Sequence, residues 1–315
     1  MGTVGDDGGR VGPDPDPDSL RWTPVRLNSG QTRARDRDAI HKGRNVIKER
    51  VPEPDRRGVR RGVRSEEGVD YIEIVYDERE GGLLDLDTVT ALVHAAHTHG
   101  VLAVAHTMIE QRAREAIAAG IDGLAHLFLG DAVAEDFGQF AADHGVFVIP
   151  TLTVLRGLCG YRPYNDLMAD QWLANQISHG CPPIPIRPAD PSRNHLYTAA
   201  MHALCQLTAA GVPVLAGTDT GPPTVALGVF GYGATRHGEL ELLVEAGLSP
   251  VRALVAATSA PARAFQLADR GLIRPGTRAD RVLVDGDPTD AIRDTRNLVV
   301  VWKRGIRIES ADPDS

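Results

Sequence analysis

From residue 69 onward, short apolar runs alternate with segments whose apolar residues recur every three or four positions. The runs are rich in Val, Ile and Ala and lie at 69–75, 101–107, 123–128, 146–152 and 212–219. Helical spacing marks the intervening segments 86–99, 110–119, 132–144 and 196–210. Strands buried on both faces and separated by helices are typical of parallel sheets. The pattern therefore predicts an α/β fold, a partial (β/α)8 TIM-like barrel, with an open doubly wound sheet as the alternative.

The pattern changes after the last of these runs. Two further helices are expected at 239–246 and 250–265, and two strands at 280–285 and 298–308. These strands predict a small C-terminal β appendage, a remnant of a β-sandwich. We therefore divide the chain into a basic segment at 1–65, a barrel portion at 66–268, and the appendage with its tail at 269–315.

Charge is distributed unevenly along the 315 residues, whose net charge is −8. Residues 21–64 hold fourteen Lys or Arg and five Asp or Glu, with many Pro and Gly, so we expect residues 1–65 to lack regular structure. The alternative is that this basic segment is an arm that binds nucleic acid. It is disfavoured because acidic residues are mixed through the segment and Trp22 is its single aromatic residue.

Composition excludes several classes of protein. No run of 18 apolar residues is present, which argues against a membrane-spanning helix, and the first 30 residues lack the apolar core of a signal peptide. The three cysteines, Cys159, Cys181 and Cys205, lack metal-type spacing and favour reduced thiols. We therefore expect a cytoplasmic protein without a membrane partner.

Polar residues of chemical interest lie at or near the carboxyl ends of the predicted strands. They are Glu73, His106, His126, Thr151 and Asp219. In a β/α barrel this end carries the active site. Two histidines at equivalent positions of successive strands, with carboxylates on neighbouring strands, form the ligand set that zinc prefers, although such residues can also simply face solvent. The pattern favours a metal site.

Several segments carry a family resemblance. They are GVDYIEIVYDE, AVAHT, AGIDGLAHLF, PTLTV, LAGTDTG, HGELELLVEAGLSPVRALVAATSAPARAF and GLIRPGTRADRVLVDGDP. In order and spacing they resemble the amidohydrolase superfamily, in its imidazolonepropionase-like and Xaa-Pro-dipeptidase-like branch, over roughly residues 66–308. The resemblance implies a distorted (β/α)8 barrel with a small β-sandwich, and divalent metal that activates water.

The resemblance also assigns roles to individual residues. His106 and His126 match the metal-binding histidines of barrel strands 5 and 6, and Glu73 takes the strand-4 position of a metal-binding carboxylate. Asp219 matches the strand-8 aspartate that binds metal and accepts the proton of the attacking water. His237 matches a histidine often found near the substrate. We expect one divalent ion, with zinc favoured and manganese or iron as alternatives.

The printed sequence departs from the family pattern in its first part. Upstream of residue 94 it holds no His-x-His pair, and His41 is the single histidine there. Three barrel strands are also unaccounted for, and because open strand edges pair readily, we expect homo-oligomers or aggregates. The predicted function is metal-dependent hydrolysis of a C–N amide bond in a small-molecule, cyclic or peptide-like substrate. The alternative is a catalytically inactive amidohydrolase-like remnant.

Overall fold

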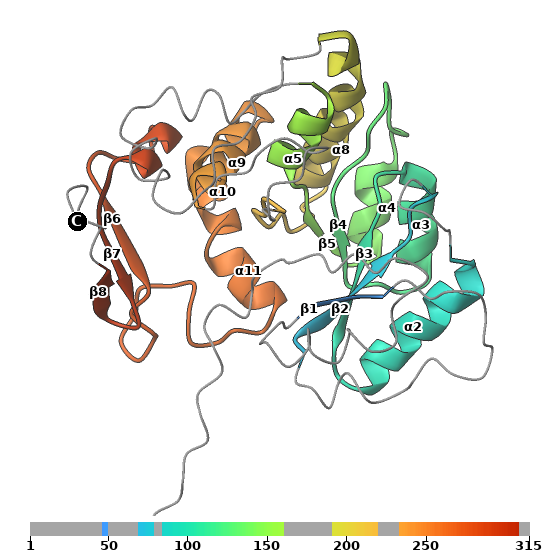
Figure 1. Cartoon of the computed structure of the whole chain (residues 1–315), viewed down its shortest axis with the longest axis horizontal. Coiled ribbons are helices and arrows are strands. Elements are labelled where there is room, and N and C mark those ends of the chain that lie inside the picture. Colours follow the sequence, from blue (N-terminus) through green and yellow to red (C-terminus); the bar gives the residue numbers. More distant parts are fainter. Residues whose placement is uncertain (1–45, 50–68, 79–83, 161–190, 220–232, 309–315) are drawn as a thin grey trace, which may run out of the picture.

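A computed structural model describes residues 46–49, 69–78, 84–160, 191–219 and 233–308 (Figure 1). Its centre is a five-stranded parallel sheet in the order β1-β2-β3-β4-β5. The strands are β1 (Val46–Glu49), β2 (Tyr71–Val75), β3 (Leu102–His106), β4 (Gly123–Ala125) and β5 (Phe147–Ile149). An extended segment continues the sheet beyond β5, because Val148 pairs in parallel with Val214.

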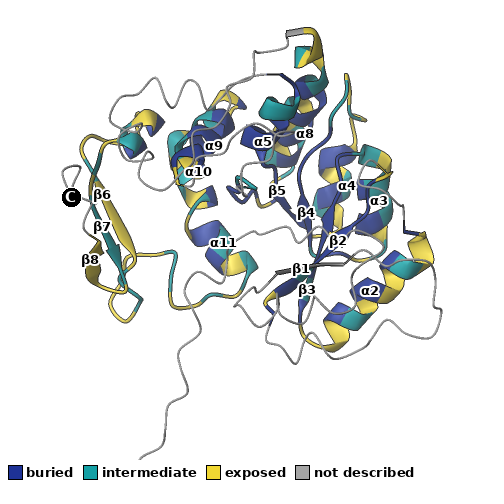
Figure 2. Ribbon diagram, in the orientation of Figure 1, coloured by how far each residue is buried: buried dark blue, intermediate teal, exposed yellow. Residues whose placement is uncertain are grey.

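Helices that connect the strands cover one face of this sheet. They are α2 (Leu86–Thr98), α3 (Glu110–Ala118), α4 (Phe137–Asp143) and α8 (Thr198–Ala209). Their apolar sides share one core with the strand residues that point toward them, such as Ile74, Ala105 and Leu124. Figure 2 shows this interior as dark blue ribbon along the strands and the inner sides of the helices. None of the described helices is long and apolar enough to cross a lipid bilayer.

The opposite face of the sheet holds a smaller apolar cluster. Tyr71, Val104, Phe147 and Leu215 meet here, and they are covered by Ala260 of α11 (Ser259–Ala264). Because side chains alternate along a strand, the residues two positions beyond Tyr71 and Val104 point to this same face. The face is therefore apolar toward the amino ends of the strands and can become polar toward their carboxyl ends.

The chain then leads through helices to a second, separate sheet. The helices are α5 (Leu152–Leu158), α9 (Ala234–Glu245) and α10 (Pro250–Ala256), and short 3-10 helices are η2 (Pro191–Tyr197) and η3 (Ile292–Arg296). The second sheet is antiparallel and consists of β6 (Arg281–Val284), β7 (Leu298–Lys303) and β8 (Ile306–Ile308). In Figure 1 it lies on the far side of α9, α10 and α11 from the central sheet.

These elements confirm the predicted α/β class and add detail that the pattern did not supply. β1 lies inside the segment expected to lack regular structure, because backbone pairing with β2 needs no amphipathic pattern. The single helix expected at 250–265 is two helices, since Thr258 leaves helical geometry at φ −133° and ψ −88°. The predicted strand 298–308 turns at Gly305 into β7 and β8.

The central sheet is not closed into a barrel within the part of the chain that the structure describes. Among those residues, β2 is the one strand that pairs with β1, so the far side of β1 has no described strand. The limits proposed for the three segments stay predictions.

Candidate metal centre

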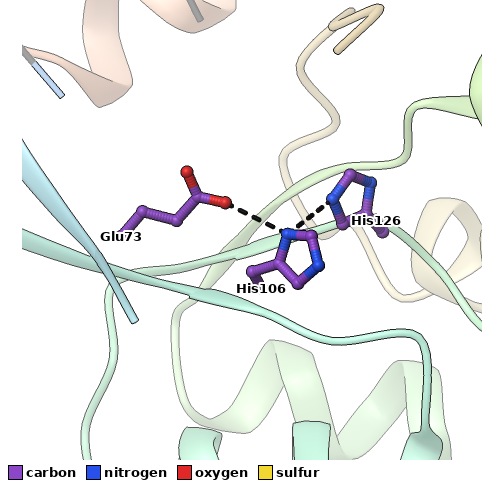
Figure 3. A group of neighbouring side chains, drawn as sticks. All are labelled: Glu73, His106 and His126. Atoms are coloured by element: carbon purple, nitrogen blue, oxygen red, sulfur yellow. Dashed lines mark hydrogen bonds and ion pairs between the residues drawn. The ribbon is translucent and has the colours of Figure 1, made fainter. Parts of the chain in front are cut away.

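The carboxyl ends of β2 and β3 bring the first two predicted ligands together. Glu73 lies on β2 and His106 ends β3, and the parallel register pairs Val75 with His106. Both residues are buried, at 0% and 5% exposure. Glu73 Oε1 lies 3.1 Å from His106 Nδ1 (Figure 3). A buried carboxylate and imidazole in contact lower the cost of removing either group from water.

His126 completes the group from the next strand. It follows β4 directly, is 2% exposed, and its Nε2 lies 2.9 Å from His106 Nδ1. The two imidazole rings meet edge to face, at an interplanar angle of 83°. In Figure 3 the carboxylate and the second imidazole approach the same nitrogen of His106 from opposite sides.

The three residues fit a divalent metal by donor chemistry and by proximity. One ligand atom of each of Glu73, His106 and His126 lies within 4.8 Å of the other two. Two nitrogens bound to zinc at about 2.0–2.1 Å and tetrahedral angles lie about 3.4 Å apart. The observed 2.9 Å between the imidazole nitrogens therefore needs a widening of about half an ångström. Rotation of the side chains can supply such a shift.

Backbone strain is concentrated around this centre. Five non-glycine residues among those described have positive φ, and three of them follow neighbouring members of the central sheet. These are His126 at 75°, Thr151 at 49° and Asp219 at 47°. Each such residue costs about 1–3 kcal/mol, and strain of this kind clusters at functional sites. The left-handed geometry turns the chain sharply where each strand ends.

Thr151 contacts the group formed by Glu73, His106 and His126 from outside. Its hydroxyl Oγ1 lies 2.6 Å from His126 Nδ1, and the residue is completely buried. Its position at a strand end in the sequence defined no role for Thr151. The structure assigns it a hydrogen bond to the imidazole nitrogen that faces away from His106.

Asp219 lies at the same end of the sheet but not within the three-residue group. It is partly buried, and its charge acts on Tyr71 of β2. Burial first, and then the charges of Glu73 and Asp219, raise the pKa of Tyr71 well above its usual value. Both carboxylates therefore face the same interior, while the role of Asp219 as a metal ligand stays a prediction.

His237 points toward the C-terminal part of the chain. It lies on α9, half-buried, and its Nδ1 is 3.1 Å from Thr295 Oγ1 of η3. The Thr295 hydroxyl donates to the carbonyl of Ile292, so it accepts from His237. In this conformation the structure does not bring His237 to the metal group, and its catalytic role stays a prediction.

The sequence did not reveal Glu239 as a buried carboxylate near the site. Glu239 of α9 is 0% exposed and reaches the amino end of α5. Its carboxylate accepts from the backbone N–H of Leu152 at 2.9 Å, and from the N–H and hydroxyl of Thr153 at 2.8 and 2.7 Å. Burial raises the pKa of Glu239 to about 7. A Glu within the polar run HGELE carried no signal that set it apart from a surface residue.

Comparison with families of known proteins gives a match over most of the chain. The model of the Amidohydrolase family matches residues 47–308, a range that begins in β1 and ends with β8. Imidazolonepropionase from Pyrobaculum arsenaticum is 40% identical over 75 residues, which are 24% of this chain and 17% of that protein.

Solved structures share the fold at low sequence identity. A Xaa-Pro dipeptidase aligns at a TM-score of 0.57 and 22% identity, covering 78% of this chain and 56% of that one. Phenylurea hydrolase B aligns at 0.57 and 21% identity, covering 78% and 54%. The ochratoxinase of A. niger aligns at 0.56 and 20%, covering 78% and 52%. The chain spans little more than half the length of these proteins.

Proposed function

The chain belongs to the amidohydrolase family, and from this premise we propose that it hydrolyses amide-type C–N bonds with one divalent metal ion held by Glu73, His106 and His126. The observation that carries the proposal is the convergence of these three buried side chains from three neighbouring strands. Burying one carboxylate and two imidazoles together is costly unless they are paired or bind an ion.

The chemistry of the donors favours zinc. Imidazole nitrogen and carboxylate oxygen suit zinc, while manganese and iron accept the same donors. When bound, zinc would lower the pKa of its water to about 7 and would polarise a carbonyl oxygen. Three protein ligands leave a position open, as in catalytic rather than structural zinc sites.

The chain's own residues supply the remaining functions. Asp219, on the same interior as Glu73, is the group that we assign as proton acceptor and as donor to the leaving nitrogen. Such general acid–base catalysis contributes about 10²–10⁴ in rate. The apolar side chains around Tyr71 and Val104 exclude water from the inner side of the site. His237 could contact substrate only after leaving Thr295.

The substrate class follows from the family and from the names of the relatives. A cyclic amide or a dipeptide-like molecule is the substrate that we propose. The similar proteins include an imidazolonepropionase and a Xaa-Pro dipeptidase. A panel of cyclic amides, N-acyl amino acids and Xaa-Pro dipeptides would therefore test the proposal.

Metal content and hydrolysis test this function together. We expect the full-length chain, purified without chelator, to hold about one zinc per chain and to hydrolyse a member of the panel. His106→Ala and His126→Ala should each lose the metal and the activity. His202→Ala, which replaces a histidine of α8 outside the group, should lose neither. A chain that binds no metal would instead support the inactive remnant.

A further inference from the structure

His126 has two distinct ring nitrogens with different surroundings. Nε2 faces His106 and the metal position, and Nδ1 faces the Thr151 hydroxyl at 2.6 Å. Neutral imidazole carries one proton, so Nε2 can offer a lone pair to a metal only if Nδ1 holds that proton. The Thr151 oxygen is the acceptor that this tautomer requires.

Thr151 is free to accept this bond because it does not cap its own helix. It is the N-cap residue of α5, where threonine normally accepts from the backbone N–H groups of the first turn. Here its side chain makes no cap bond. Glu239 from α9 accepts from Leu152 and Thr153 in its place. A carboxylate from a distant helix thus takes over the capping.

We propose that Glu239 and Thr151 form a positioning relay that holds His126 with Nδ1 protonated and Nε2 directed at the metal. Glu239 anchors the first turn of α5, the anchored turn holds Thr151 in its left-handed conformation, and Thr151 fixes the imidazole. Both are positioning residues, since neither belongs to the three-residue metal group. The purpose of the relay, which is to prepare His126 for a metal ion, rests on the proposed function. The hydrogen bonds that form the relay do not depend on that function.

The arrangement is energetically expensive, which argues against an incidental role. Glu239 is buried with its pKa raised to about 7, and Thr151 has φ of 49°. A Thr151 side chain that capped α5 itself would make the buried carboxylate unnecessary. The partners of metal-binding histidines orient the ring, and their loss typically costs 10–100-fold in metal affinity.

The first test observes the imidazole in metal-free protein. The full-length chain is labelled with ¹⁵N-histidine, and the tautomer of His126 is read from its nitrogen shifts and couplings. We expect the Nδ1–H form in the wild type, its loss in Thr151→Val, and its return in Thr151→Ser, which restores a hydroxyl. An unchanged Nδ1–H signature in Thr151→Val would overturn the proposal.

The second test measures zinc affinity by competition with a chelating dye. Thr151→Val and Glu239→Gln should each weaken zinc binding about 10–100-fold, and Thr151→Ser should recover most of the loss. Glu245→Gln is the matched control, since it also connects α9 to α5, through Arg156 at 2.9 Å, but at the surface. This control should change affinity less than about two-fold.

The outcomes separate the relay from the metal function. If Glu245→Gln weakens binding as much as Glu239→Gln, general packing of α9 on α5 explains the loss and the relay is wrong. If the wild type binds no zinc while the tautomer of His126 is lost in both Thr151→Val and Glu239→Gln and kept in Glu245→Gln, the proposed function fails and the relay stands.

Discussion

The two sheets of the molecule are built from similar residues but differ in their surroundings. In the central sheet, Val104 and Ala125 are completely buried, and helices or apolar clusters cover both faces. In the C-terminal sheet, Val282 is 59% and Ile306 is 70% exposed. Figure 2 shows this contrast as dark blue strands in one sheet and yellow and teal strands in the other.

The contrast explains why the candidate centre belongs to the central sheet. A carboxylate and two imidazoles can be held in fixed positions only where packing immobilises the strands that carry them. The C-terminal sheet is instead connected to the rest of the molecule through η3, whose Arg296 and Thr295 contact Glu241 and His237 of α9. Ile292 of η3 also joins the main core. We therefore expect substitutions in and around the two sheets to differ in their effects on turnover and on stability.

The largest expected effect is on catalysis. Asp219→Asn should lower turnover by about 10²–10⁴-fold while metal content stays the same, because the amide cannot accept a proton. The matched variant is Asp280→Asn, next to β6 of the C-terminal sheet, whose carboxylate accepts from the backbone N–H of Arg304. It should leave turnover unchanged. Steady-state kinetics measures the turnover of both variants, and elemental analysis measures their metal content. An equal loss of turnover in the two variants would contradict the distinction between the sheets.

The effect of core substitutions on the free energy of unfolding should differ almost as strongly between the two sheets. Phe147→Ala should lower the free energy of unfolding by about 3–5 kcal/mol, since it empties a space against Phe265, whose ring centre lies 5.5 Å away. Ile306→Ala in the C-terminal sheet should change it by less than about 0.5 kcal/mol. Urea denaturation gives both values. Similar changes in the free energy of unfolding for the two variants would contradict the claim that the two sheets differ in packing.

Stability should also depend on pH through Glu239. Its pKa rises on folding from 4.5 to about 7, so between these values the folded chain binds more protons than the unfolded chain. The free energy of unfolding should therefore fall by roughly 3 kcal/mol as pH rises through this window and stay level above it. Glu239→Gln should remove this slope, and Glu245→Gln should keep it. Urea titrations at several pH values provide the measurement.

The smallest effect concerns a helix cap. Asp85 accepts from the backbone N–H of Thr88 at 2.7 Å and begins α2, which packs on β2 and β3. Asp85→Ala should cost about 1 kcal/mol. Hydrogen exchange should show the loss at amides of the central sheet and leave those of β6–β8 unchanged. Equal deprotection of both sheets would mean that they open as one unit.

Much of the site could be predicted because its residues end apolar runs. Glu73, His106 and His126 each interrupt or end a strand that is otherwise apolar, and the register of parallel strands then brings them together. The alternation of strands and helices likewise predicted the fold class. These features depend on local pattern, which a single sequence contains.

The remaining features depend on contacts between distant segments. Glu239 meets Thr153 across 86 residues, and no local pattern records which polar residue of a helix is buried. The turn of His237 toward Thr295 depends on where η3 packs. β1 was missed because four residues of strand in a charged segment give too short a pattern.

The burial of the three candidate ligand side chains has a kinetic consequence for the proposed metal ion. An ion held by residues that are 0–5% exposed can leave only when the surrounding chain opens locally. Its rate of release would then be set by that opening rather than by chelator concentration. Dialysis against a mild chelator would remove metal slowly, and brief partial denaturation would accelerate the exchange.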